Sequence, residues 1–457
     1  MQPLPIITPG YQSRSLNADA QRMINWIPES SDGGKTLAML LPTPGLELDV
    51  NLGDGPIRGI FSFMGARITV SGSKVFSGST EIGTLTTSTG PVRAAQNTES
   101  LVIVDGALAY GWDGSSWTSL PDIGTATHIG FVDQYLVFND PSVNGAFRHT
   151  NLVSVTVDPL DVATAEGSPD ALEAVIVDHR QVWLIGTEST EVFHNFGDPD
   201  QVFQRIEGSF IEMGCAAKYS AVKADNAVGW LSRNAYGQGQ FVLCRGYTPQ
   251  IVSTRAIEYL WAQYSRIDDC NAWSYIEDGH TYVVLNFPTA EATWVFDLAT
   301  GLWHERASYQ LGRHIANCHC FHGGAHYVGD YRSGKVYQQS TLLNDDDGET
   351  VIRTRTFPYL SSNRARAFMG VFELEFETGL AGATQAQPQA MLSWSDDNGR
   401  TFSTELWRGM GEQGNYTKRL RWNRLGSFRN RIFKVAVSDT VRTTVLAAYG
   451  DVTVGSH

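Results

Sequence analysis

The densest group of chemically reactive side chains in this sequence is a short run of cysteine and histidine. Cys318, Cys320 and His322 alternate along a strand-forming stretch, with His314 and His326 nearby. Successive side chains of a strand point to opposite faces, so these three would share one face and could contact a metal ion. Structural zinc sites are closed by paired ligands at C-x₂₋₄-C and H-x₃₋₅-H spacings, which this run lacks. We therefore predict a core face with a histidine at a turn, and no metal site.

A second candidate for chemistry is SWSDDNGRTF at residues 393–402, which matches the Asp-box pattern S-x-D-x-G-x-T-[W/F]. The matching residues are Ser395, Asp397, Gly399, Thr401 and Phe402. Sialidases carry this box, so a glycosidase is one hypothesis. The box itself is a hairpin turn: the carboxylate accepts backbone N–H groups, glycine takes a positive φ and the aromatic ring plugs the core. We predict a structural role, because only one clear box is present and no arginine triad or Tyr–Glu pair can be assigned.

Other motifs give no positive case for catalysis. The acidic run at residues 345–349 lacks the spaced oxygen ligands of a calcium loop, so we expect a solvated linker. The sequence contains no Walker motif, no dinucleotide glycine fingerprint, no G-x-S-x-G and no H-E-x-x-H. No pair of Asp, Glu or His residues has a spacing that predicts acid–base work. The sequence predicts no catalytic residue and no cofactor.

The elements that must position these residues are short strands separated by glycine-rich turns. Hairpins begin near residues 66, 101, 134, 182, 227, 281 and 326, which are 33 to 54 residues apart. Repeats of that length are typical of propeller blades. Residues 55–341 therefore predict a β-propeller of six or seven blades. The segment TWVFDLATGLWHE resembles a kelch-type blade ending, with Trp294 and Trp303 packing on either side of a turn.

The flanking segments differ from this pattern. Residues 1–54 are rich in proline and predict an extended arm that packs on a neighbouring domain, with a short helix at residues 17–27. Residues 342–350 form the acidic linker. Beyond it, segments such as VFELEFETG and RIFKVAVSD alternate as half-buried antiparallel strands do. Residues 351–457 therefore predict an antiparallel β-sandwich-like domain, and the fold class is all-β with minor helix, including one at residues 254–262.

Composition sets further limits. The 457 residues are 42% hydrophobic and 18% charged, as in a folded globular protein. The sequence has no run of about 18 apolar residues, so we expect no membrane insertion. Its five cysteines are few and scattered, which predicts free thiols and a reducing cytosol. The start lacks the charged and apolar order of a signal peptide, so we expect synthesis in the cytoplasm.

Charge is divided unevenly along the chain. The net charge is −14, which opposes general binding to nucleic acid. Residues 351–457 carry 14 basic and 9 acidic side chains, a net of +5, whereas residues 1–350 carry 20 basic and 39 acidic, a net of −19. Either this division reflects solubility and chance, or the two parts of the chain form oppositely charged surfaces with different roles.

Several segments together resemble a known family. NADAQRMINWIPES at residues 17–30, followed by LLPTPGLEL at residues 40–48, is similar to the opening of the packaged-DNA stabilisation proteins. These are the tail hub or nozzle proteins of lambdoid and related short-tailed bacteriophages, the podoviruses. Further similarity lies in residues 180–220, 229–258 and 392–439. The resemblance covers most of the chain, and its specificity lies in the order and combination of the segments.

The resemblance implies a structural protein of the virion tail, made in the host cytoplasm, and no enzyme. It implies a homo-hexameric ring below the portal–adaptor ring that closes the exit channel, retains packaged DNA and forms the conduit for ejection. Double-stranded DNA would pass through it transiently and without sequence specificity. A tail needle or tip protein would plug the channel, and tailspikes or fibres would attach outside.

A closed ring requires two different complementary surfaces on each subunit. Arginine and aromatic residues dominate interface energetics, and one stretch combines them. The interface candidates are Tyr416, Lys418, Arg419, Arg421, Trp422, Arg424, Phe428, Arg429 and Arg431. Two alternatives stay open for this stretch: a solvated strand pair whose arginines bridge local carboxylates, or contact with the phosphates of passing DNA. For the whole protein, the alternatives are a propeller glycosidase or carbohydrate-binding protein, and a plain propeller scaffold.

Overall fold

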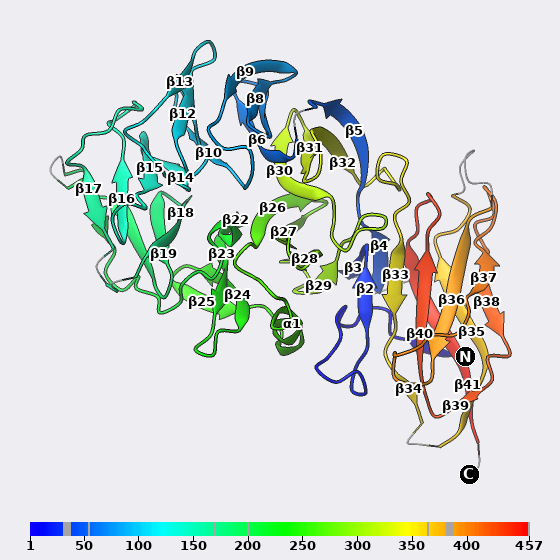
Figure 1. Ribbon diagram of the computed structural model, residues 1–457. Coiled ribbons are helices and arrows are strands. Elements are labelled where there is room, and N and C mark those ends of the chain that lie inside the picture. Colours follow the sequence, from blue (N-terminus) through cyan, green and yellow to red (C-terminus); the bar gives the residue numbers. More distant parts are fainter. Residues whose placement is uncertain are drawn as a thin grey trace.

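The structure, a computed structural model, describes residues 1–30, 38–53, 55–165, 167–168, 170–198, 201–362, 365–380 and 387–455. Its architecture is all-β, a propeller and a sandwich lying side by side (Figure 1), as the sequence predicted. One α-helix lies in these ranges, α1 (Arg255–Trp261), and it begins where the side chain of Thr254 accepts a hydrogen bond from the Ile257 N–H. Within the same ranges, no helix is long and apolar enough to cross a membrane.

The propeller has seven four-stranded blades, each an antiparallel sheet whose first strand lies innermost. Blade one consists of β6 (Ile57–Phe63), β7 (Ala66–Ser71), β8 (Lys74–Ser77) and β9 (Thr80–Thr84), and blade two of β10 (Arg93–Gln96), β11 (Leu101–Val104), β12 (Ala109–Trp112) and β13 (Trp117–Ser119). Blade three consists of β14 (Ile129–Val132), β15 (Tyr135–Asn139), β16 (Ala146–His149) and β17 (Val162–Thr164), and blade four of β18 (Leu172–Asp178), β19 (Gln181–Gly186), β20 (Thr190–Asn195) and β21 (Phe203–Arg205).

Blade five follows the 3₁₀ turn η1 (Lys218–Ser220) and consists of β22 (Val222–Ala224), β23 (Ala227–Arg233), β24 (Gly239–Arg245) and β25 (Thr248–Ile251). Blade six consists of β26 (Asn271–Glu277), β27 (His280–Phe287), β28 (Ala292–Asp297) and β29 (Trp303–Glu305). Blade seven consists of β30 (Ala316–His322), β31 (Ala325–Asp330), β32 (Lys335–Ser340) and β5 (Gly45–Asn51). The N-terminal part of the chain therefore supplies the outermost strand of the last blade, and β30 packs beside β6 to close the ring.

Tight turns link the first two strands of several blades. Glu277 of β26 pairs with His280 of β27 across two residues, Asp278 and Gly279, which have φ of +50° and +85°. Two positive φ values mark a turn whose twist matches that of the flanking strands. The same two-residue arrangement joins β6 to β7 through Met64 and Gly65. The residues between these hairpin strands therefore form tight turns, as the sequence predicted.

The axis of the propeller is crossed by side chains. Arg93 of blade two donates to the carbonyl of Tyr219 (2.9 Å) and to Asn271 Oδ1 of blade six (3.2 Å). Asn271 in turn donates to the carbonyl of Asn317 in blade seven (2.8 Å), and Asn317 donates to the carbonyl of Ile57 in blade one (3.1 Å). These bonds connect blades that are far apart in sequence, so they hold the inner strands together.

The second domain is a sandwich of two sheets. One contains β1 (Gln2–Leu4), β3 (Trp26–Ser30), β4 (Ala38–Pro42), β35 (Ala367–Phe376), β38 (Leu420–Asn423), β39 (Ser427–Phe428) and β41 (Val445–Val454). The other contains β2 (Arg22–Ile24), β33 (Arg353–Thr356), β34 (Leu360–Ser361), β36 (Gln389–Ser395), β37 (Leu406–Gly409) and β40 (Asn430–Val437). Buried Trp26, Phe372, Trp422 and Phe433 belong to the core between them.

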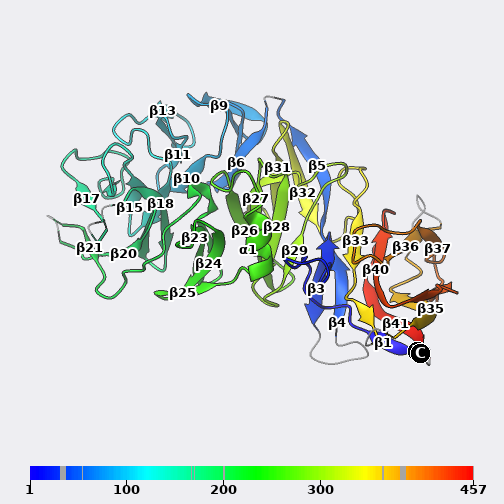
Figure 2. The ribbon, with the colours of Figure 1, turned by 60° about the horizontal axis from the view of Figure 1, so that its bottom comes forward.

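Residues 1–54, predicted as an extended arm, instead supply strands to both domains (Figure 2). The helix predicted at residues 17–27 is wrong, because β2 and β3 occupy that stretch. Strand β2 pairs with β29 of blade six on one side and with β33 of the sandwich on the other, so a single ten-stranded sheet runs through both domains. Long-range pairing of this kind overrides local helix propensity.

Candidate functional site

The arginine-rich stretch lies at one edge of the sandwich. Strands β37 and β38 end their respective sheets and contact each other, and we call residues 405–431 around them the basic edge. Six of the predicted interface residues have exposed side chains there: Tyr416, Lys418, Arg419, Arg421, Arg424 and Arg429. Trp407 of β37, which the sequence analysis did not single out, is 51% exposed beside them. The signal that could have found it is its place in a short edge strand next to Arg408.

Three predicted interface residues lie inside the sandwich. Trp422 and Phe428 belong to the core, and the Trp422 indole donates to the Leu406 carbonyl (2.7 Å). Arg431 is 3% exposed, binds both carboxylate oxygens of Asp396 at 2.7 Å and lies 4.8 Å from the Phe428 ring centre. Alternation along β38 turns Trp422 inward and Arg421 outward. These three residues therefore hold the edge in place and are not at the surface.

Local carboxylates neutralise part of the basic edge. Arg421 binds Glu373 of β35 through Nε, and Nη1 of Arg419 lies 3.7 Å from the other oxygen of the same carboxylate. Glu373 itself is buried. At Arg419 and Arg421, the structure agrees with the alternative in which the arginines bridge local carboxylates. The edge as a whole keeps an excess of positive charge, because residues 405–430, which leave out the buried Arg431, contain six Lys and Arg and two Glu.

The Asp box is a turn of the kind predicted. Asp397 accepts hydrogen bonds from the backbone N–H of Thr401 (2.9 Å), the Thr401 hydroxyl (2.6 Å) and the N–H of Arg400 (3.1 Å). The Thr401 hydroxyl and the backbone N–H groups lower the pKa of Asp397 well below its usual range. Gly399 has φ of +80° and would place a Cβ 2.8 Å from Ala20, so the turn docks on the N-terminal segment.

The aromatic residue of the box differs from the expectation. Phe402 is half-buried and does not plug the core, and the ammonium of Lys434 lies 4.4 Å from its ring centre. The Asp397 carboxylate accepts its hydrogen bonds from residues of its own turn and from the Ser395 hydroxyl, at 2.7 Å. This arrangement stabilises a hairpin and leaves no free carboxylate for acid–base work.

The cysteine and histidine run lies on β30 and faces its neighbours in the propeller. Cys318 and Cys320 pack with Tyr327 and Ile57, and burial raises the pKa of the Cys318 thiol to about 12. His319 points to the opposite face and stacks on Trp273 with ring centres 5.3 Å apart. Protonated thiols are poor metal ligands. In the part of the chain that the structure describes, no three His, Cys, Asp or Glu side chains gather as a metal site would require.

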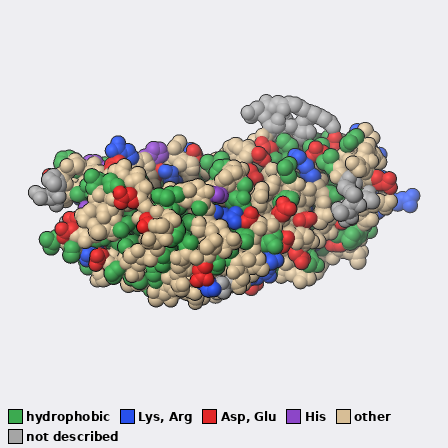
Figure 3. All heavy atoms as spheres, turned by 90° about the horizontal axis from the view of Figure 1, so that it is seen from above, with side chains coloured by type: hydrophobic (Ala, Val, Ile, Leu, Met, Phe, Trp, Pro, Cys, Tyr) green, Lys and Arg blue, Asp and Glu red, His purple; other side chains and the backbone are tan. Residues whose placement is uncertain are grey.

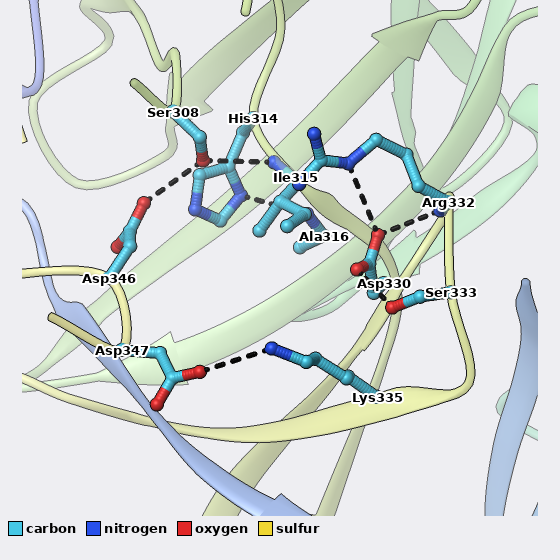
Figure 4. A network of polar contacts seen from close by, with 10 residues as sticks. All are labelled: Ser308, His314, Ile315, Ala316, Asp330, Arg332, Ser333, Lys335, Asp346 and Asp347. Carbon is cyan, nitrogen blue, oxygen red and sulfur yellow. Dashed lines mark hydrogen bonds and ion pairs between the residues drawn. The ribbon is translucent and has the colours of Figure 1, made fainter. Parts of the chain in front are cut away.

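The acidic linker packs on blade seven (Figure 4). Ser308 donates to Asp346 Oδ2 (2.9 Å) and accepts from the Ile315 N–H (3.2 Å), and Lys335 lies 3.4 Å from Asp347. These residues border a cavity of about 330 Å³ between the linker and the blade. Burial raises the pKa of Asp346. The linker is therefore not fully solvated as expected, because β5 brings the backbone of Leu46 into hydrogen bonding with residues 345 and 347.

A larger cavity, of about 390 Å³, lies at the far end of the propeller between blades three and four. Its apolar lining includes Leu160, Val162 and Phe203, and Asp161 lines it beside them. Leu160 is 88% exposed. We call the described residues from 151 to 212, which leave out 166, 169, 199 and 200, the acidic end, because they carry ten acidic side chains and two arginines, a net of −8. A count of charge in shorter windows of the sequence would have found it.

Two carboxylates that line the cavity have neighbouring groups of opposite or potential positive charge. Glu191 is 1% exposed, accepts from the Gly167 N–H at 2.7 Å and lies 3.2 Å from Nη1 of Arg205. Asp161 lies 4.0 Å from His149 Nδ1. The contacts of Glu191 with Arg205 and the Gly167 N–H hold it in the wall of the blade.

Comparison with protein families and known structures gives the following matches. A model of the bacteriophage P22 Gp10 β-propeller matches residues 2–342, and a model of the P22 Gp10 β-sandwich matches residues 353–453. No curated protein matches the chain.

Three solved structures are similar at low identity. The computationally designed Ika8 protein is 13% identical, with a TM-score of 0.38 over 70% of this chain and 99% of that one. PorZ of Porphyromonas gingivalis is 10% identical, with a TM-score of 0.39 over 71% of this chain and 44% of that one. The N-terminal domain of Nup159 is 10% identical, with a TM-score of 0.38 over 69% and 98%. Similarity at this level supports no conclusion about activity or partners.

Proposed function

The chain belongs to the bacteriophage P22 Gp10 family of phage DNA-stabilisation proteins, and on that premise we propose that it is the nozzle or hub subunit of a short virion tail. In this role it assembles as a homo-hexameric ring below the portal–adaptor ring. The ring closes the exit channel, retains the packaged DNA and forms the conduit through which that DNA leaves. A tail needle or tip protein plugs the channel, and tailspikes or fibres attach outside.

The observation that carries this proposal is the shared ten-stranded sheet. A part of a pressure-bearing ring must not bend between its domains, and β2 joins blade six to the sandwich by backbone hydrogen bonds on both sides. Rigid secondary structure transmits load better than a flexible linker does. The cross-axis bonds of Arg93 and Asn271 stiffen the propeller in the same way.

The surface charge also suits this role. The net charge of −14 limits non-specific adhesion of DNA, since affinity for the duplex depends on cations that neutralise phosphates. Opposite charge at the acidic end and the basic edge supplies the two unlike surfaces that head-to-tail contact in a ring requires. Transient, non-specific passage of double-stranded DNA is what such a conduit permits.

We propose a structural role without catalysis. The feature that suggested a glycosidase was the Asp box, and its carboxylate is taken up by the turn. A glycosidase requires two carboxyl groups that flank the scissile bond at a defined separation. Glu191, a buried carboxylate in the cavity of the acidic end, is held instead by Arg205 and a backbone N–H.

The proposal is tested by electron microscopy of the purified protein, alone and mixed with a portal–adaptor complex. We expect six copies of the chain in a ring on the complex, and a lower oligomeric state for the protein alone. A monomer that never binds the complex but hydrolyses glycan substrates would contradict the proposal.

A further inference from the structure

The basic edge is built like a contact surface. Trp407 and Tyr416 are 51% and 70% exposed, although Trp and Tyr normally bury most of their area in a folded chain. Arg408 and Lys418 lie among them and are exposed. Arg408 donates to the backbone carbonyls of Trp407 and Arg421, at 2.8 and 3.1 Å, which holds its guanidinium against the edge. Aromatic and arginine side chains presented together are the usual anchors of protein interfaces.

The acidic end has the complementary features. Leu152, Leu160 and Phe196 are exposed by 57%, 88% and 57%, and they belong to the loops around β17 and β20. The cavity of about 390 Å³ opens beside Leu160 and Val162. Asp158 is exposed next to them, and Asp161 is partly exposed. Polar side chains, Arg205 among them, line the cavity together with the apolar ones. The exposed Leu160 with Asp158 and Asp161 nearby fits an aromatic ring that has a cation beside it.

The two surfaces lie at opposite ends of an elongated molecule. Strand β17 is at one end and β37 at the other in both ribbon views (Figures 1 and 2). Viewed from above, a basic side chain projects at the sandwich tip (Figure 3). Surfaces at opposite ends cannot meet within one chain. They can meet between successive copies of it.

We propose that the acidic end docks on the basic edge of a second copy of this chain, with Trp407 entering the cavity and the cations around it facing the carboxylates at its border. The contact is head to tail, because the two surfaces differ, so repetition of it closes a ring or continues as a filament. The partner is a second copy because this chain itself supplies the matching charge, a net of −8 over the described residues from 151 to 212 against +4 over residues 405–430. This inference rests on the proposed ring and identifies the surfaces that form it.

A charge-reversal cycle on the full chain tests the contact. One variant carries Asp158→Lys with Asp161→Lys, a second carries Arg408→Glu with Lys418→Glu, and a third carries all four changes. Each of the first two variants is expected to lower the fraction assembled on the portal–adaptor complex at least tenfold. The third restores opposite charges across every contact, so its assembly returns to within twofold of the wild type. Arg266→Glu, a reversal on the exposed connection between blades five and six, is the matched control and leaves assembly unchanged.

A disulfide cross-linking test of the same contact does not depend on charge. Leu160→Cys and Trp407→Cys in the same chain are expected to form disulfides between copies in the assembled state, seen as a ladder on non-reducing gels. Either change alone gives no ladder, and the five native cysteines are buried or half-buried. Unchanged circular dichroism and an unchanged unfolding midpoint show that the variants are folded.

The outcomes separate the two proposals. If the wild type forms rings and the reversal variants assemble equally well, or the four-fold variant does not recover, the docking contact is wrong while the ring role stands. If the basic-edge variant assembles normally but loses affinity for duplex DNA, the edge binds phosphates, and the docking contact is again wrong. If the wild type never forms a ring, the proposed function and the contact both fail.

Discussion

Ile24 of β2 lies in parallel register with Glu305 of β29, and through this pair the sheet of blade six continues into the sandwich. On its other side, Ile24 pairs antiparallel with Thr354. Arg22 reinforces the junction by binding both carboxylate oxygens of Glu305 at 2.7 Å. Because β2 has only three residues, the rest of the junction depends on the side chain that follows it.

That side chain belongs to Asn25, and we expect its replacement to weaken the attachment of the propeller to the sandwich. Its Nδ2 donates to the carbonyls of Ala307 and Ile352, both at 2.8 Å, and its Oδ1 accepts from the Ala307 N–H at 3.0 Å. Its backbone has φ of +58°, which asparagine tolerates better than alanine does. Asn25→Ala should lower the free energy of unfolding by about 3 kcal/mol or more, measured by guanidinium denaturation with tryptophan fluorescence.

Asn25→Gly separates the two contributions. Glycine keeps the positive φ without strain and loses only the hydrogen bonds, so it should cost about 1 kcal/mol less than alanine. Both variants within about 0.5 kcal/mol of the wild type would mean that the junction does not depend on Asn25.

Arg431 is expected to stabilise the sandwich although the sequence suggests a surface role. Its guanidinium is buried against Phe428 and Trp394 and binds Asp396. Arg431→Met should lower the free energy of unfolding by about 2–3 kcal/mol, less than for a fully buried ion pair because Asp396 is half-exposed. Arg429→Met, a neighbour with an exposed side chain, should change it by less than about 0.5 kcal/mol. Equal effects of the two variants in thermal melts would contradict this assignment.

Close packing where blade seven meets blade one should exclude any side chain at Gly329. A Cβ there would lie 2.3 Å from Ile57 Cγ2 and 3.0 Å from Cys318 Sγ. Gly329→Ala should therefore destabilise the protein by about 1–3 kcal/mol. Gly409→Ala is the matched control, since a Cβ at Gly409 meets nothing within 4 Å and its φ is not positive. Calorimetry should find the first melting temperature lowered and the second nearly unchanged, and a neutral Gly329→Ala would count against a tightly closed ring.

His280 should make stability depend on pH. Its ring nitrogens lie 2.8 Å from Asp297 and 2.9 Å from Glu29. Burial opposes the charged ring, but the hydrogen bond to Asp297 and the charges of both carboxylates prevail and raise the pKa of His280. A raised folded-state pKa gives stability that is complete below about pH 6.5, the unfolded value, and is lost as the pH rises through the folded value.

The advantage of the wild type over His280→Gln should therefore shrink from about pH 6.5 upward. Melting temperatures of the two proteins across pH 5.5 to 9 measure this directly. A difference that stays constant over the whole series would show that the ring is not charged in the folded protein.

Features that depend on neighbouring residues were predictable from the sequence. The Asp box satisfies Asp397 within four residues of chain, so its turn follows from the motif alone. The two-residue turn at Asp278 and Gly279 is equally local, and it marks the first hairpin of blade six. Regular recurrence of such hairpins determined the propeller, and strand alternation after residue 351 determined the sandwich. The helix near residue 255 was also predictable, since Thr254 caps it locally.

Features that depend on distant residues were decided only by the tertiary structure. Arg22 and Glu305 are 283 positions apart, and no local signal shows that a three-residue strand will pair in parallel with blade six. The same holds for β5, which completes blade seven from the N-terminal side and sets the blade number at seven. In the basic edge, composition alone could not tell exposed Arg421 from buried Arg431, because burial depends on which face of a strand packs against the opposite sheet. Local hydrogen bonds are encoded by adjacent residues, whereas pairing partners and burial are set by the packing of the whole chain.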